Sequence, residues 1–90
     1  MKFEYDLTKS KLNKEKHGID FEEAKNLWNN LIAVIPSKYI DEQRKLVIGL
    51  LDKKFWTAII TERKGIVRLI SVRRSRMEEN KLYEKIAENN

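Results

Sequence analysis

The chain contains no cysteine and only one histidine, one proline and three glycines. Without cysteine neither disulfides nor thiol chemistry is available, so the fold must depend on its core and its hydrogen bonds. A single histidine disfavours a zinc site, and we expect no metal or other cofactor. The longest apolar runs, such as Leu46 to Leu51, are far too short to span a bilayer. The first twenty residues are charged throughout and lack the apolar stretch of a signal peptide, which predicts a cytoplasmic protein.

Ninety residues are enough for a single domain, which we place at residues 1–90. Lysine and arginine outnumber aspartate and glutamate by 19 to 14, so the net charge is +5. Such an excess favours a polyanionic partner, whether nucleic acid, an acidic protein or an anionic membrane. A requirement for solubility alone explains a charge of this size as well, so the positions of the basic residues must decide.

Two helices are predicted in the first third of the chain. Asp6 is a suitable N-cap for a polar helix over Lys9 to Lys16, and Gly18 suits its C-terminal end. Asp20 with Glu23 then resembles a capping box that begins a second helix. Its apolar residues follow at helical spacing and are Phe21, Ala24, Leu27, Trp28 and Leu31.

Most of the remaining chain has the pattern of strands. Residues 1–5 form a short edge strand, and Pro36 confines the apolar run before it to another sheet edge. Three β-rich runs then predict an antiparallel meander whose middle run, apolar on both faces, is central. Tight turns at Asp52-Lys53 and Lys64-Gly65 separate these runs, which are Arg44 to Leu51, Lys54 to Thr61 and Ile66 to Arg73.

A final helix is predicted after the meander. Ser75 and Glu78 match an S-x-x-E capping box, and Leu82, Tyr83 and Ile86 give the helix one apolar face. The order of elements predicts an α+β fold. In it, two N-terminal helices pack on an antiparallel sheet of about four strands, followed by a C-terminal helix.

Basic residues gather in residues 61–76, TERKGIVRLISVRRSR, where Glu62 is the one acid. Forked guanidinium groups on a rigid sheet are suited to binding phosphate. Strand alternation places Arg68 and Arg74 on one face of the last run and Arg73 on the reverse, so a continuous arginine face is not assured. Taken singly, each basic residue fits an exposed side chain or an ion pair with Glu62, Glu78 or Glu79. Together they favour nucleic-acid binding, and they are Arg63, Lys64, Arg68, Arg73, Arg74 and Arg76.

Lys16 and His17 form a second candidate site. An imidazole is the usual general acid or base near neutral pH, and a neighbouring lysine can stabilise a phosphate. Capping of the helix C-terminus explains the same two side chains, and on spacing alone it is the preferred interpretation.

Several short motifs follow one another along the chain. They are Phe3-Glu4-Tyr5-Asp6, Lys16-His17-Gly18-Ile19 with Phe21-Glu22-Glu23-Ala24, Glu42 and Arg44 before Ile48-Gly49, and Thr61-Glu62-Arg63 with Arg68-Leu69-Ile70-Ser71 and Arg73. Together they resemble the BrnT family of toxins from type II toxin–antitoxin modules. The resemblance covers nearly the whole chain, and Val72 stands where the family usually has alanine.

This resemblance implies a RelE-like fold and an endoribonuclease that cleaves RNA and arrests translation and growth. It also implies neutralisation by a BrnA-type ribbon-helix-helix antitoxin, whose complex binds its own operator DNA. We therefore expect a metal-independent ribonuclease in which Arg63, Arg68 and Arg73 bind the scissile phosphate. Lys16 and His17 would be a phosphate contact and a proton carrier. The residues expected to bind RNA more generally are Lys64, Arg74 and Arg76.

Two alternatives to catalysis stay open at this point. The chain could be a basic domain of the same fold that binds nucleic acid, or an inhibitor of a protein target, as ParE-type toxins inhibit DNA gyrase. A purely structural partner subunit is the second alternative, and it predicts neither toxicity nor RNA cleavage.

Overall fold

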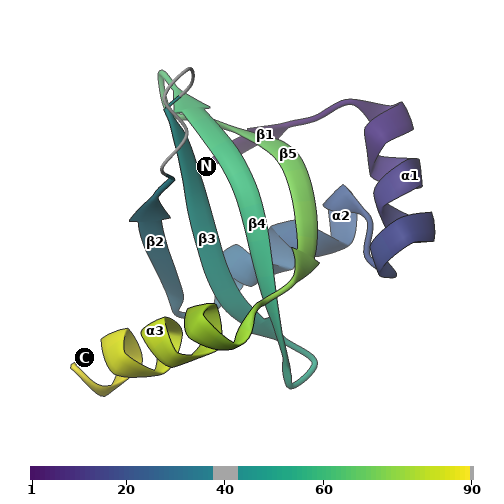
Figure 1. The fold of residues 1–90 in the computed structure, drawn as a ribbon. Coiled ribbons are helices and arrows are strands. Elements are labelled where there is room, and N and C mark those ends of the chain that lie inside the picture. The colour runs from purple at the N-terminus through teal and green to yellow at the C-terminus, as the bar shows by residue number, and fades with distance from the viewer. Residues whose placement is uncertain (38–42, 90) are drawn as a thin grey trace.

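The computed structural model describes residues 1–37 and 43–89 (Figure 1). Glu42, one of the motif residues, lies outside this part of the chain. Within the described part, no helix is long and apolar enough to cross a membrane. The elements in chain order are β1 (Lys2–Glu4), α1 (Leu7–His17), α2 (Phe21–Ala24), the 3-10 helix η1 (Lys25–Asn29), β2 (Ile32–Pro36), β3 (Arg44–Leu51), β4 (Lys54–Arg63), β5 (Ile66–Arg74) and α3 (Met77–Glu88).

The predicted meander is confirmed, and β4 lies at the centre of the sheet order β1-β5-β4-β3-β2. Both turns of the meander use two consecutive residues with positive φ. The values are 53° and 65° for Asp52 and Lys53, and 52° and 80° for Lys64 and Gly65. Two-residue turns of this kind match the right-handed twist of the strands they join. They therefore fix the register of β3 with β4, and that of β4 with the first residues of β5.

The sheet has five strands and is mixed, so the prediction of about four antiparallel strands is wrong in these details. β1 pairs with β5 in parallel, with Glu4 opposite Arg68. A parallel pair needs a long crossover, and here the crossover contains most of the chain. The α+β class itself is confirmed, with β2 on the far edge as Pro36 predicted.

The N-terminal caps are as predicted, but the second helix is shorter. Asp6 accepts a hydrogen bond from the Lys9 amide at 3.0 Å, and the Asp20–Glu23 capping box is present. α2 ends after four residues and continues as the 3-10 helix η1. Ala24 and Leu27, three residues apart, are both buried, whereas Leu31 lies after the end of η1 and is exposed.

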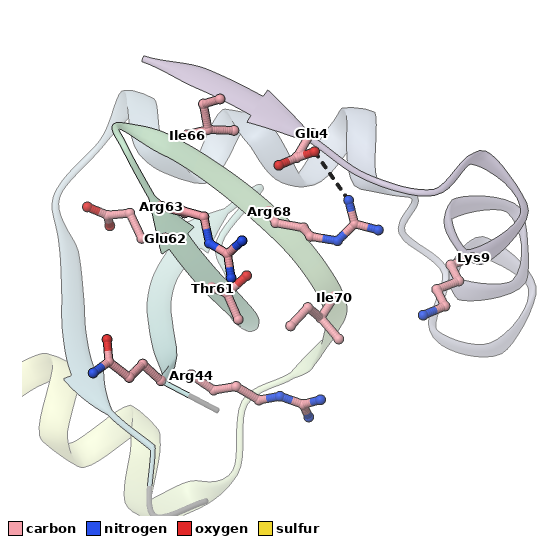
Figure 2. A pocket seen from close by; sticks show the side chains of 10 residues that line it. Glu4, Lys9, Arg44, Thr61, Glu62, Arg63, Ile66, Arg68 and Ile70 are labelled. Atoms are coloured by element: carbon pink, nitrogen blue, oxygen red, sulfur yellow. Dashed lines mark hydrogen bonds and ion pairs between the residues drawn. The ribbon is translucent and has the colours of Figure 1, made fainter. Parts of the chain in front are cut away.

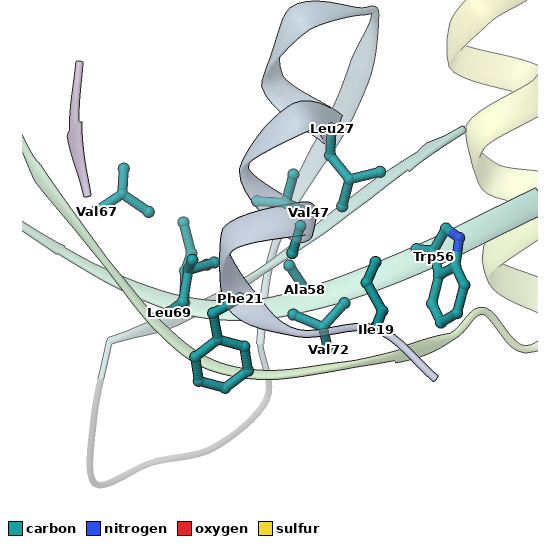
Figure 3. Close-up of a cluster of buried hydrophobic side chains, with 11 residues drawn as sticks. Ile19, Phe21, Leu27, Val47, Trp56, Ala58, Val67, Leu69 and Val72 are labelled. Carbon is teal, nitrogen blue, oxygen red and sulfur yellow. The ribbon is translucent and has the colours of Figure 1, made fainter. Parts of the chain in front are cut away.

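The two faces of the sheet are covered by different elements. α2 and η1 pack on one face, where most of the core lies (Figure 3). The opposite face, called the outer face below, carries α3 over β2 and β3, with Tyr83 and Ile86 against the sheet as predicted. The buried residues of the larger core cluster are Ile19, Phe21, Ala24, Leu27, Val47, Trp56, Ala58, Ile60, Val67, Leu69 and Val72.

A β-bulge in β5 changes which side chains share a face. Ile60 pairs with Leu69 and Ile59 pairs with Ser71, so Ile70 is an extra residue without a partner on β4. One extra residue reverses, for every later residue of the strand, the face of the sheet to which its side chain points. Leu69 and Val72 consequently both enter the core although one number is odd and the other even.

The predicted grouping of the arginines on β5 is therefore wrong. Arg68 and Arg73 share the outer face, one on each side of the bulge, and Arg74 lies on the core face. The guanidinium carbon of Arg74 is 5.5 Å from the ring centre of Trp56, a core residue. Arg73 instead pairs with Thr57, whose side chain points towards α3.

Asn13 attaches α1 to the edge of β5 immediately after the bulge. Its side-chain amide donates to the Val72 carbonyl at 2.8 Å and accepts from the Val72 amide at 3.1 Å. The same amide group donates to the carbonyl of Ile19 at 2.8 Å. β1 pairs only with the first three residues of β5, so Asn13 takes the place of a strand partner further along this edge.

α3 begins one residue later than the predicted capping box. Its N-cap is Arg76, whose backbone amide donates to the Glu79 carboxylate at 2.8 Å. The hydroxyl of Ser75, predicted as the cap, lies 2.7 Å from that of Thr57 instead. The predicted Ser75–Glu78 capping box is wrong because the Ser75 hydroxyl contacts Thr57 in the sheet. Glu79, rather than Glu78, accepts the hydrogen bond at the start of the helix.

Candidate functional site

A hollow of about 690 Å³ lies on the outer face of the sheet (Figure 2). This volume is within the range of small-molecule sites, and the hollow is large enough to hold a nucleotide. Of the ten lining residues within the described part of the chain, four are cationic and two are acidic, so this lining attracts anions. The lining residues are Glu4, Lys9, Gln43, Arg44, Thr61, Glu62, Arg63, Ile66, Arg68 and Ile70.

The sheet places four of these side chains in one row across four strands. Arg44 on β3 pairs with Thr61 on β4, Thr61 pairs with Arg68 on β5, and Arg68 pairs with Glu4 on β1. Neighbouring strands are about 4.8 Å apart, so the backbones of the two arginines are separated by about 10 Å. The small Thr61 side chain between them leaves space over the sheet.

The cations of the hollow differ in how they are neutralised. Arg68 donates to the Glu4 carboxylate at 3.3 Å, and both side chains are about half exposed. Arg63 has no carboxylate within 4 Å among the residues that the structure describes. Its side chain extends over the sheet towards Thr61, while Lys9 faces the same space from α1 (Figure 2). Arg63 is thus an exposed guanidinium available to an incoming anion.

Arg73 lies on the outer face but does not line the hollow. Its Nη1 and Nη2 atoms donate to Oε1 and Oε2 of Glu79, each at 2.8 Å. Glu79 also accepts from the Thr57 hydroxyl at 2.9 Å, and its side chain is only 8% exposed. The hydrogen bonds from Arg73 lower the pKa of Glu79 to about 2. In this arrangement Arg73 joins β5 to α3.

Lys16 and His17 lie in the last turn of α1 and do not line the hollow either. Gly18 has a φ of 82°, and its amide donates to the Lys14 carbonyl at 2.9 Å, so the predicted C-terminal cap is confirmed. Lys9 lines the hollow from the other end of the same helix. Seven residues are almost two helical turns, so Lys16 lies on the same side of α1 about 10 Å beyond Lys9.

The three residues expected to contact RNA more generally are dispersed. Lys64 is exposed in the turn after β4, and Arg76 is exposed at the start of α3. Arg74 lies over Trp56, and its Nε donates to the Phe55 carbonyl at 3.3 Å. None of the three lines the hollow.

Glu4, Lys9 and Arg44 also line the hollow, although they were not among the site residues predicted from the sequence. The position of Arg44 could have been predicted from a signal in the sequence. A two-residue turn at Asp52-Lys53 sets the register of β3 and β4, which places Arg44 opposite Thr61. For Glu4 no such signal exists, because three residues of parallel strand do not specify a partner.

The groups around the hollow can bind a phosphodiester and stabilise added negative charge. Guanidinium groups form paired, charge-assisted hydrogen bonds to phosphate oxygens, and a lysine ammonium adds a further charge. Glu4 adds a carboxylate to the lining of the hollow beside Arg68, and a carboxylate can accept a proton. Over residues 1–37 and 43–89, no three histidine, aspartate or glutamate side chains gather closely enough to hold a metal ion.

A comparison with protein families identifies the family of the chain. The family described as "Ribonuclease toxin, BrnT, of type II toxin-antitoxin system" matches residues 5–79, which extend from the end of β1 into α3. The matched residues include every lining residue of the hollow except Glu4. No curated protein matches the sequence. Since the match covers far more than half of the chain, the protein belongs to the BrnT family of ribonuclease toxins from type II toxin–antitoxin systems.

Proposed function

We propose that the hollow on the outer face is where this toxin cleaves RNA, and that cleavage proceeds without a metal ion. The supporting observation is that Lys9, Arg44, Arg63 and Arg68 converge on one open space from three strands and a helix. Attack of the ribose 2′-oxygen on phosphorus adds negative charge to the phosphate in the transition state. Donors arranged around that charge before the reaction are commonly the largest contribution to such catalysis.

Within this proposal the arginines have separate roles. Arg63 and Arg68 hold the scissile phosphate, and Arg44 contacts it or the next phosphate from the opposite side of Thr61. Arg73, also expected at the phosphate, acts indirectly by holding β5 against α3, since Glu79 occupies both ends of its guanidinium.

RNA that extends beyond the hollow would meet further basic residues. Lys16 and His17 continue the basic surface of α1 beyond Lys9, and Lys64 and Arg76 are exposed on other elements. Arg74 is left out of the RNA surface because it lies on the core face over Trp56.

The partner that neutralises the toxin is, in this proposal, a ribbon-helix-helix antitoxin of the BrnA type that covers the hollow with acidic side chains. Opposite charges speed association, and the toxin's net charge of +5 makes that rate higher at low salt. The complex would bind its operator DNA through the antitoxin. Co-expression with a candidate ribbon-helix-helix antitoxin, followed by copurification and an operator-binding assay, tests this part.

Cleavage is tested with purified protein and a labelled single-stranded RNA in EDTA. We expect products with 2′,3′-cyclic phosphate ends, and a loss of roughly a hundredfold or more for Arg63→Ala and for Arg68→Ala. Arg74→Ala is the matched control, because it removes an arginine from the same strand as Arg68 but on the other face. Cleavage that stops in EDTA and returns with Mg²⁺ contradicts the metal-free reaction. Full activity of both hollow variants contradicts the site.

Expression in cells separates this function from inhibition of a protein target. A ribonuclease stops bulk translation first, whereas a gyrase inhibitor stops DNA replication first. Incorporation of labelled amino acids and of labelled thymidine, followed over the first minutes after induction, gives the order. Arrest of DNA replication before translation would favour the non-catalytic alternative.

A further inference from the structure

Among the residues that the structure describes, two acids line the hollow, Glu4 and Glu62, and they are placed differently. The Glu62 carboxylate lies 3.8 Å from the Lys45 ammonium, and its side chain points away from Arg63 and Arg68 (Figure 2). The Glu4 carboxylate lies beside Arg68, facing the space that the cations surround. We propose that Glu4 is the general base of the RNA cleavage proposed above, taking the proton from the ribose 2′-hydroxyl. This inference rests on the proposed function.

The residues on either side of Glu4 hold it in place. Phe3 packs edge-on against Trp28 with ring centres 5.0 Å apart, and Tyr5 packs in the same way against Phe21 at 5.6 Å. Both aromatic residues pack against the core, so strand alternation directs Glu4 to the outer face. β1 is only three residues long, yet it is anchored before and after Glu4. A general base must be held in a fixed position, and these two contacts fix the backbone on both sides of Glu4.

The contact between Glu4 and Arg68 explains how the base could become active when RNA binds. Their 3.3 Å ion pair joins two half-exposed side chains, and pairs of this kind contribute little stability. A phosphate offers Arg68 two oxygens and stronger, paired hydrogen bonds. Once Arg68 binds the phosphate, Glu4 loses its cation and lies next to the group that Arg68 holds. The 2′-hydroxyl that attacks this phosphate belongs to the adjoining ribose, so base and phosphate contact must be neighbours.

The reaction balances as a transesterification. Glu4 accepts the 2′-hydroxyl proton while the 2′-oxygen forms a bond to phosphorus, which gives a 2′,3′-cyclic phosphate. The bond from phosphorus to the 5′-oxygen breaks, and its electron pair leaves with that oxygen. The 5′-oxygen takes a proton from water, and the hydroxide so formed is neutralised by the proton on Glu4. No proton or electron is gained or lost overall, and Arg63 and Arg68 stabilise the charge on the phosphate throughout.

The test compares Glu4→Gln with Glu62→Gln, which removes the other carboxylate of the hollow. Glutamine keeps the size and hydrogen-bonding oxygen of glutamate but cannot take up the proton. We expect the single-turnover cleavage rate of a labelled single-stranded RNA to fall about 10²- to 10⁴-fold for Glu4→Gln and by less than about threefold for Glu62→Gln. Glu4→Asp, which keeps the carboxylate on a shorter arm, should recover part of the lost rate.

A binding measurement distinguishes a catalytic role of Glu4 from a structural one. A 2′-O-methyl RNA of the same sequence has no proton to lose and cannot be cleaved. Glu4→Gln should bind it as tightly as the unaltered protein or a few-fold more tightly, because a negative charge beside the phosphate is gone. Weaker binding in proportion to the lost cleavage would mean that Glu4 only maintains the site, and would overturn the inference.

Failure of the proposed function looks different from failure of this inference. If the unaltered protein cleaves no RNA, the proposed function fails, and the role of Glu4 fails with it. If the unaltered protein cleaves RNA and Glu4→Gln cleaves it equally fast, only the assignment of Glu4 fails. A rate loss for Glu4→Gln with normal binding, together with partial recovery in Glu4→Asp, supports both.

Discussion

Arg73 and Glu79 face each other as a two-pronged ion pair, with both N–O distances 2.8 Å, at the junction of β5 and α3. The Arg73 side chain is 20% exposed and that of Glu79 is 8% exposed. Removing either partner leaves a charge in a place that water hardly reaches, which is strongly destabilising. The two β5 arginines on the outer face therefore differ in their surroundings. Arg68 borders the hollow, whereas Arg73 binds α3 through Glu79.

Replacing Glu79 by glutamine should lower the free energy of unfolding at pH 7 by about 3 kcal/mol. This loss follows from the lowering of the Glu79 pKa from 4.5 to about 2, at about 1.4 kcal/mol for each pH unit. Urea denaturation followed by tryptophan fluorescence measures it. Glu78→Gln, on the exposed side of the same helical turn, is the control. Equal stability of the two variants would show that the ion pair contributes nothing.

Stability should also depend on pH in a defined window. The pKa of Glu79 is lower in the folded chain than in the unfolded chain, so its contribution is complete above about pH 5. The contribution is lost as the pH falls towards 2. The difference in unfolding free energy between the unaltered protein and Glu79→Gln should therefore shrink steadily from pH 5 to pH 2. Denaturation curves at several values in this range test it, and a difference that stays constant contradicts it.

RNA affinity should depend on salt with a slope set by the cations of the hollow. Each phosphate contact to a single strand contributes about −0.7 to the slope of log K against log salt concentration. Contacts from Lys9, Arg44, Arg63 and Arg68 predict a slope of about −3, and Arg63→Ala should reduce it to about −2. Titrations with an uncleavable 2′-O-methyl RNA provide the measurement. A slope that Arg63→Ala leaves unchanged would place the RNA elsewhere.

Arg74→Ala should affect stability and leave RNA binding nearly unchanged. The guanidinium lies over the Trp56 ring at 5.5 Å, and such cation–π contacts contribute about 0.5–1 kcal/mol at exposed sites. We expect a loss of that size in the free energy of unfolding, with a change in Trp fluorescence. Affinity for RNA should change less than twofold. A drop in affinity as large as that of Arg68→Ala would mean that RNA also contacts the core face of β5.

The parts of the fold that local chemistry determines could be predicted from the sequence. The Asp6 cap, the Asp20–Glu23 box and both two-residue turns each depend on a few adjacent residues. The bulge at Ile70 could not be predicted, because neither glycine nor proline marks it. A single unpaired residue there was enough to exchange the faces of Arg73 and Arg74.

The candidate site was predictable only in part, for related reasons. The charge of the hairpin predicted anion binding in general, and the family resemblance singled out Arg63 and Arg68, which both line the hollow. An ion pair with Glu79 was among the alternatives considered for each arginine, but choosing Arg73 as its partner requires the position of α3 on the sheet. Glu4 and Lys9 come from elements whose neighbours are set by tertiary packing, so their local sequence does not show that they meet the hairpin.

The pairing of β1 with β5 has a consequence for the time at which the toxin first becomes able to act. Glu4 and Arg68 are 64 residues apart in the chain but form one wall of the hollow. At about 5–20 residues per second, a ribosome needs about 3 to 13 s to proceed from one to the other. A nascent or prematurely released chain that ends before β5 has neither Arg68 nor the strand on which β1 docks. If the hollow is the site of RNA cleavage, as proposed above, that site is incomplete until about three quarters of the chain has been synthesised.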